Sequence, residues 1–192
     1  MSNLLLDVPF ELPVIKSSLE AFAYYTHAPT ETEFADLEAN DPFVQALIRS
    51  IDAALGQLEP LLLETVYGEL LAATGAECAR QLEKAVSRNS GACFNRLGGL
   101  QLDKELRELT AYFASVGGWG VREKFARLTQ MAALLNVESV EEAREFYQGF
   151  SGGGSGGVAG GGVTWRLTPT ELRNTLALRV DLPVDEIRQF KL

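Results

Sequence analysis

Apolar side chains recur at spacings of three and four residues along most of this chain, the pattern of helices that bury one face. One helix is predicted after Asp41 and Pro42, an N-cap residue and an N1 proline that precede Val44, Leu47 and Ile51. Comparable start signals occur at Thr30, Glu59, Asp103, Gly120, Ser139, Thr168 and Pro183. We therefore expect an all-α protein of eight to nine helices with almost no strand.

The longest predicted helix begins near Glu59 and Pro60 and ends near Arg88, where residues 89–91 (NSG) supply a stop signal. One row along this helix consists of Leu62, Val66, Leu70, Ala73, Glu77 and Arg80. The apolar stripe weakens after Gly75. We therefore expect the second half of this helix to be more exposed than the first, or to bridge two packing units.

A glycine-rich stretch at residues 151–162 (SGGGSGGVAGGG) predicts a flexible loop near the C-terminus. It formally contains the pattern GxGxxG at Gly152, Gly154 and Gly157. A phosphate-binding loop, however, follows a buried strand and opens directly into a helix. This stretch follows a predicted helix and leads to an extended segment around Trp165, so we interpret it as a linker.

The composition narrows the class of protein. With 192 residues, of which 46% are hydrophobic and 22% charged, the chain is globular and long enough to bury a core. Its net charge of -9 argues against nucleic acid as a partner, because phosphate binding needs a basic face. Two cysteines, Cys78 and Cys93, are too few for a disulfide framework, so a reducing compartment is expected. They also lack the CxxC spacing of redox or zinc chemistry. We also expect no signal peptide and no membrane-spanning segment.

The acidic charge is concentrated in the first part of the chain. Residues 1–77 hold 13 acidic residues against Lys16 and Arg49, whereas residues 78–192 hold 13 acidic and 15 basic residues. This asymmetry suggests two packing units, or an acidic docking face on the first of them.

Candidate chemistry is sparse. His27 is the single histidine, and the sequence contains neither HExxH nor GxSxG. Nothing in the pattern sets two carboxylates in opposed environments, as acid–base catalysis needs. We expect no catalytic residue, no cofactor and no metal site, and we interpret His27 as a capping or solvated residue of a turn.

Arg127 is the basic residue least easily explained as surface. On a helical wheel it borders the apolar stripe of Phe125, Leu128 and Met131, where a guanidinium would need a partner unless it extended to water. We predict that Arg127 and Glu171 form an ion pair that joins the C-terminal helix to the core. Because a capping-box glutamate normally binds its own N-cap amide, we expect the two roles of Glu171 to compete.

A second candidate is the turn expected at residues 95–99 (NRLGG), which would join the two units. Its candidate interaction residues are Asn95, Arg96, Gly98 and Gly99. The alternative is ordinary turn chemistry, with glycine at positive φ.

Several stretches together resemble the C-terminal region of subunit 4 of the conserved oligomeric Golgi complex. They are residues 38–45 (EANDPFVQ), 94–107 (FNRLGGLQLDKELR), 122–131 (REKFARLTQM), 164–169 (TWRLTP) and 177–181 (ALRVD). The resemblance runs from about residue 33 to the C-terminus and is looser over the first 30 residues. Trp165, which lies in one of these stretches, joins the interaction candidates.

The resemblance implies a helical-rod tether built of stacked bundles. Residues 1–88 would form the acidic, distal part of a penultimate bundle, and residues 89–192 a C-terminal bundle with the flexible loop 151–162. The implied function is non-enzymatic: vesicle tethering in retrograde intra-Golgi transport, as a peripheral protein on the cytosolic face of the Golgi membrane. The glycine-rich stretch is longer than the corresponding loop expected for the family.

The partners that the resemblance implies are other subunits of the complex, SNARE proteins with their Sec1/Munc18 regulator, and Rab GTPases. The contact with the SNARE regulator is expected mainly in an N-terminal part that this chain lacks. An alternative is a generic cytosolic α-helical adaptor or scaffold unrelated to Golgi traffic. Co-purification with tether subunits would separate the two hypotheses.

Overall fold

The computed structural model describes residues 27–40, 42–88, 93–118, 120–151 and 164–190. In chain order the elements are α2 (Glu31–Asn40), α3 (Pro42–Leu55), the 3-10 turn η1 (Glu59–Leu61), α4 (Glu64–Arg88), α5 (Arg96–Gly117), α6 (Val121–Asn136), α7 (Val140–Ser151), α8 (Pro169–Leu176) and α9 (Val184–Gln189). Within these ranges the β-structure consists of one isolated parallel bridge between Phe94 and Arg179. The all-α class is therefore confirmed, while most of the loop predicted at 151–162 lies outside the described residues.

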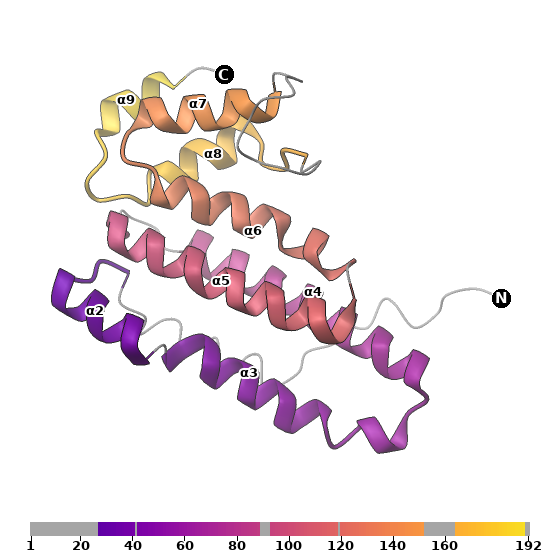
Figure 1. Cartoon of the computed structure of the whole chain (residues 1–192). Helices are drawn as coiled ribbons and strands as arrows, with labels where there is room; N and C mark the ends of the chain where they lie inside the picture. Colours follow the sequence, from indigo (N-terminus) through magenta and orange to yellow (C-terminus); the bar gives the residue numbers. More distant parts are fainter. Residues whose placement is uncertain (1–26, 41, 89–92, 119, 152–163, 191–192) are drawn as a thin grey trace.

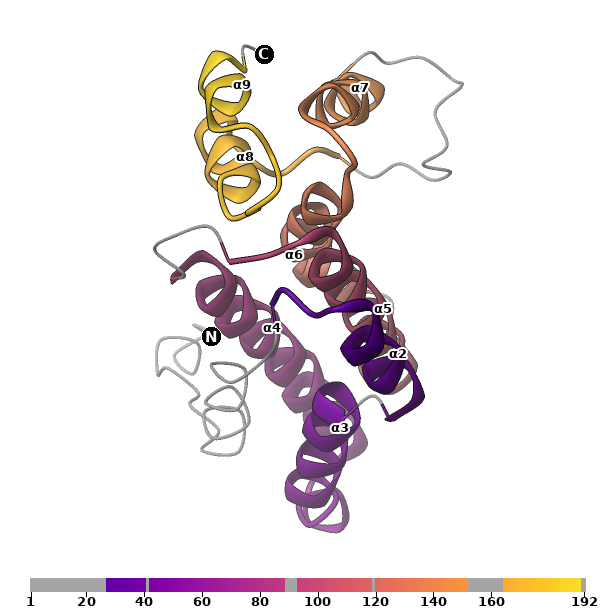
Figure 2. The ribbon, with the colours of Figure 1, turned by 90° about the vertical axis from the view of Figure 1, so that its left-hand side faces the viewer.

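The helices are stacked in layers (Figure 1). Helices α4, α5 and α6 pack against one another in the centre, with α5 and α6 forming the most extensive pair. Helices α2 and α3 contact α5 on one side, and α8 contacts α6 on the other, with α9 against α8. Figure 2 shows the same order from α3 at one end to α9 at the other.

A continuous apolar core runs through these layers. It includes Ile51 of α3, Leu82 of α4, Phe113 of α5, Phe125 of α6 and Leu172 of α8, none more than 1% exposed. Burial of such side chains is the main stabilising term for a bundle of this size. The proposed division near residue 88 falls within this core, because α4 precedes it and packs on α5 and α6, which follow it.

The long helix expected from Glu59 to Arg88 is interrupted. Residues Glu59–Leu61 form a 3-10 turn, Leu62 is extended at φ -114° and ψ 154°, and α4 begins only at Glu64. The break lies at Leu62, whose extended backbone leads the chain out of the 3-10 turn before α4 begins. Pro60 itself fits the first turn of η1, where its backbone nitrogen needs no acceptor.

The buried face of α4 also differs from the prediction. The row containing Val66, which is 45% exposed, faces outward. The buried residues are Leu71, Thr74, Gly75, Cys78, Ala79, Leu82 and Val86, most of them in the half expected to be exposed. Small side chains are buried because neighbouring helices approach closely: a Cβ on Gly75 would lie 2.8 Å from a Val121 methyl carbon.

The helix starts agree with the sequence-based predictions at two positions and differ at a third. The capping boxes predicted at Thr30 and Thr168 are confirmed by reciprocal hydrogen bonds with Glu33 and Glu171, respectively. The start predicted at Asp103 is wrong, because α5 begins seven residues earlier at Arg96.

Candidate interaction site

Arg127 of α6 lies where three segments meet. Its Nε and Nη2 donate hydrogen bonds to Oε1 of Glu83 on α4, at 3.0 and 2.9 Å. Nη2 also donates to Oε1 of Glu171 on α8 at 2.6 Å, and Nη1 donates to the backbone oxygen of Arg166 at 2.7 Å. The guanidinium therefore joins α4, α6 and the start of α8.

Glu171 fulfils both of its expected roles at once. Its Oε1 accepts from Arg127, while its Oε2 accepts from the backbone nitrogen and the hydroxyl of Thr168 at 2.7 and 2.8 Å. The expected competition between ion pair and capping box is therefore wrong, because each carboxylate oxygen serves one role. The second carboxylate, Glu83, was not predicted.

These contacts shift the pKa values of both partners. The hydrogen bond from Arg127, and next that from the Thr168 backbone, lower the pKa of Glu171 to about 2. Hydrogen bonds first to Glu83 and then to Glu171 raise the pKa of Arg127 above its ordinary value. Both groups stay charged near neutral pH, so the cluster suits a structural joint and not proton transfer.

A cavity of about 290 Å³ lies beside this cluster. Its walls come from α4, α6 and α8 and include Ser87, Met131 and Asn174 as well as Arg127. Arg127 lines this cavity, and its side chain is 36% exposed. Solvent therefore screens the ion pairs, and their contribution is that of a partly exposed network.

The segment before α8 is attached to α6 by a buried amide. Gln130 is 3% exposed, and its side chain donates to the Thr164 carbonyl at 3.0 Å and accepts from the Arg166 nitrogen at 2.8 Å. Trp165, between these residues, packs with its ring centroid 5.2 Å from that of Tyr147. Its indole nitrogen donates to the Leu167 carbonyl at 2.6 Å. The predicted candidate Trp165 thus packs the segment before α8 against α7.

The second predicted candidate, residues 95–99, is a helix start. Asn95 is the N-cap of α5, and its Oδ1 accepts from the Gly98 nitrogen at 2.8 Å. Its Nδ2 donates to the Pro29 carbonyl at 2.8 Å. Asn95 therefore fixes both the start of α5 and the chain that leads into α2.

Gly98 and Gly99 are buried in the first turn of α5. A Cβ at Gly98 would lie 1.8 Å from the His27 carbonyl oxygen, and one at Gly99 would lie 2.0 Å from the Leu135 carbonyl oxygen. The positive φ of the alternative interpretation is not found at either glycine. Close backbone approach is the reason that these positions need glycine, and the buried pair forms no exposed surface.

Arg96 is the exposed member of this group. It forms an ion pair with Glu138 at 2.8 Å, in which the two side chains are 56% and 67% exposed. An exposed pair of this kind adds little stability, so the Arg96 side chain contributes little to the packing of the bundle.

Arg179, which is not among the residues predicted from the sequence, is a buried arginine whose side chain is 1% exposed. It forms a two-point ion pair with Asp181, at 2.7 and 2.9 Å, and its Nη1 donates to the carbonyls of Leu135 and Val137, both at 2.7 Å. The guanidinium lowers the pKa of Asp181. Arg179 thereby connects the end of α6 to the segment between α8 and α9.

His27 is half-buried, so its interpretation as a solvated residue is wrong. Its ring centroid lies 4.6 Å from that of Phe94, and burial lowers its pKa. Its carbonyl accepts from the Asn95 nitrogen at 3.3 Å. His27 therefore belongs to the packing around the start of α5.

Two features of the described residues bear on the class of site. These residues contain no group of three or more His, Cys, Asp or Glu side chains arranged to hold a metal ion. None of their helices combines the length and the apolar character that crossing a bilayer requires. What the described residues do show is a helical bundle whose layers are joined by arginine clusters and close glycine contacts.

Comparison with known proteins identifies the family of this bundle. Residues 12–174 match the family model described as conserved oligomeric Golgi complex subunit 4, C-terminal. The chain therefore belongs to this family.

Several relatives carry the same name. The chain is 40% identical over 180 residues to conserved oligomeric Golgi complex subunit 4 of Bos taurus and of Homo sapiens, and 38% identical to that of Arabidopsis thaliana. Each alignment covers 94% of the chain. The chain spans 21% to 23% of the length of these relatives.

Proposed function

We propose that this chain is the C-terminal region of a non-enzymatic subunit of a Golgi vesicle-tethering complex, acting in retrograde intra-Golgi transport through protein–protein contacts. The observation that carries the proposal is the family match over residues 12–174. The name of the relatives supports other subunits of the same complex as partners. The corresponding location is peripheral, on the cytosolic face of the Golgi membrane.

The mechanical side of the proposal rests on the packing. Helices that pack side by side into one core make a stiff spacer, and the clusters around Arg127 and Arg179 fasten the terminal helices to it. Stiffness suits a tether because a rigid element holds its contact surfaces at a fixed separation. Residues 1–88 would belong to one bundle of the rod and residues 89–192 to the terminal bundle.

Within this function, Arg127, Glu171, Asn95, Gly98, Gly99 and Trp165 are proposed as residues that maintain the terminal bundle. Arg96, which is exposed, is the member proposed to contact a partner directly. Contacts with SNARE proteins, their Sec1/Munc18 regulator and Rab GTPases are further proposals.

Affinity purification with mass spectrometry tests the function. The chain, tagged and expressed in cells, is expected to recover the other tether subunits and to concentrate at Golgi membranes. Deletion of the gene that encodes the chain is expected to alter Golgi glycosylation. Recovery of a single unrelated partner, with glycosylation unchanged, would favour the alternative of a generic α-helical adaptor.

A further inference from the structure

The corner between α3 and α4 carries a group of exposed apolar side chains. Leu61 and Leu63 are 76% and 75% exposed, and Leu58 and Val66 are 37% and 45% exposed. Four of the eight large apolar side chains that are exposed in the described ranges thus fall within nine consecutive residues. Single exposed leucines are ordinary, but four exposed apolar side chains within one short segment make that segment a candidate contact surface.

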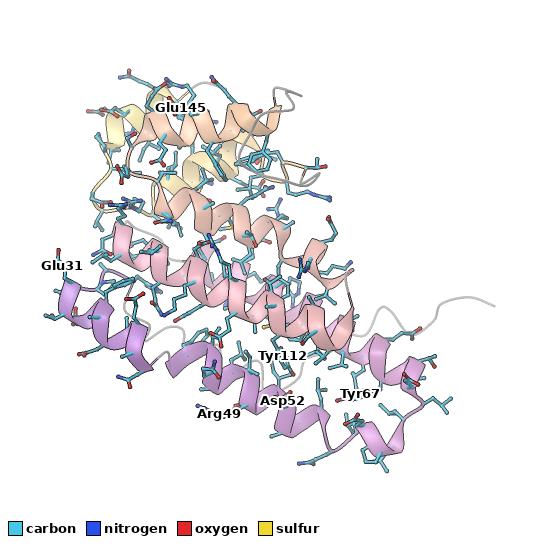
Figure 3. The ribbon with its side chains drawn as sticks, in the orientation of Figure 1. Glu31, Arg49, Asp52, Tyr67, Tyr112 and Glu145 are labelled. Atoms are coloured by element: carbon cyan, nitrogen blue, oxygen red, sulfur yellow. The ribbon has the colours of Figure 1, made fainter. Side chains whose placement is uncertain are left out.

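The same corner is acidic throughout. No lysine or arginine occurs between Arg49 and Arg80, whereas Glu59, Glu64 and Glu69 alternate with the apolar residues and are exposed. Burial and the charges of Glu59 and Asp52 raise the pKa of Tyr67, a half-buried residue at this corner. Figure 3 shows Tyr67 and Asp52 at this end of the bundle.

The position of the corner leaves it accessible. η1 and the first turns of α4 extend beyond the ends of α5 and α6, at the lower right of Figure 1. Leu61 and Leu63 lie outside the apolar core that joins α3 to α9. The surface formed by Leu58, Leu61, Leu63 and Val66 is called the leucine corner below.

We propose that the leucine corner binds a basic amphipathic helix of a partner protein. The leucines would receive the apolar stripe of that helix, and Glu59, Glu64 and Glu69 would face its lysines or arginines. Helix-in-groove recognition uses apolar anchors with charged flanks, and complementary charge sets the orientation and the rate of encounter. An acidic partner helix would be repelled, which makes the expected charge of the occupant specific.

This inference goes beyond the proposed function and does not rest on it. A chain outside Golgi traffic would show the same surface. Failure of the experiment below would leave co-purification with tether subunits unaffected, so the two proposals fail separately.

The probe is a fluorescein-labelled peptide of leucine and lysine, with leucines at positions i, i+3, i+4 and i+7 to form an amphipathic helix. Fluorescence anisotropy is expected to show saturable binding to the full chain. Leu61→Ser combined with Leu63→Ser should raise the Kd by about tenfold or more. Glu59→Gln with Glu64→Gln should raise the Kd at low salt. The difference in Kd between this variant and the wild type should shrink as the salt concentration is raised.

Four controls make the result decisive. Val180→Ser with Val184→Ser removes two apolar side chains that are 53% and 58% exposed at the α9 end, and should leave the Kd unchanged. A peptide with glutamate in place of lysine, and one of scrambled order, should not bind. Circular dichroism checks that each variant is folded.

The proposal is overturned by any of three results. The peptide could fail to bind, it could bind both double-serine variants equally, or the glutamate peptide could bind as well as the lysine peptide. Sedimentation tests the remaining occupant: if the chain self-associates and Leu61→Ser with Leu63→Ser abolishes this, the corner binds a second copy and not a basic helix.

Discussion

Arg127 and Glu171 are joined by a 2.6 Å hydrogen bond that occupies one carboxylate oxygen and leaves the other for the Thr168 cap. A single glutamate therefore both starts α8 and attaches it to α6. Because Arg127 also binds Glu83 of α4, three helices depend on one guanidinium.

Replacing Arg127 by alanine is expected to lower the free energy of unfolding by about 2 kcal/mol, since two carboxylates and the Arg166 carbonyl lose a charged donor. Urea denaturation measures this. The matched control is Arg96→Ala, which breaks an ion pair with Glu138 in which the two side chains are 56% and 67% exposed. The control should cost no more than about 0.5 kcal/mol.

A double-mutant cycle between Arg127→Ala and Glu171→Ala is expected to give a coupling free energy of about 1 kcal/mol. Strict additivity of the two changes would contradict the ion pair. Glu171→Ala alone should cost more than the coupling, because it also removes the capping box.

Stability should depend on pH through Glu171. Its pKa is lowered from 4.5 to about 2 on folding, so its stabilising contribution is present above the unfolded value and is lost as pH falls through that range. The difference in unfolding free energy between wild type and Glu171→Gln is expected to be constant at neutral pH and to shrink between these two values. A difference that grows on acidification would contradict the assignment.

Gly99→Ala is expected to destabilise the chain by about 3 kcal/mol, because the new methyl group would meet the Leu135 carbonyl at 2.0 Å. The control is Gly68→Ala within α4, where nothing lies within 4 Å of the added carbon. Since alanine favours a helix over glycine, Gly68→Ala should stabilise by about 0.5 kcal/mol. Thermal denaturation of both variants is the measurement.

Arg179→Met is expected to lower the unfolding free energy by about 3 kcal/mol, because Asp181 and two backbone carbonyls lose a buried charged donor. Arg179→Lys should recover little, since an ammonium group cannot form the two-point contact. If Arg179→Lys were as stable as the wild type in urea denaturation, a positive charge alone would be enough at this position, and the requirement for the two-point contact would be contradicted.

The sequence predicted those features that local chemistry determines. The starts of α2 and α8 follow from capping boxes at Thr30 and Thr168, which are local patterns. The start of α5 lies at Arg96 and not at the predicted Asp103, because Gly98 and Gly99 belong to the helix although their sequence is typical of a turn. Their role depends on the carbonyls of His27 and Leu135, which are distant in sequence.

The partners of the two clustered arginines, Arg127 and Arg179, also differ in how far the sequence can predict them. Glu171 could be predicted as a partner of Arg127, since a helical wheel placed the guanidinium beside the core. Glu83 could not, because its position depends on how α4 packs against α6. For Arg179, the flanking Leu178 and Val180 with Asp181 two residues later were an available signal of a buried, paired arginine.

The most direct test of the proposed tethering role is to quantify the Golgi-complex subunits that co-purify with this chain when it is tagged and expressed in cells. The wild type is expected to recover them, and Arg127→Ala to recover less once corrected for abundance. Recovery of none of these subunits with the wild type would contradict the account.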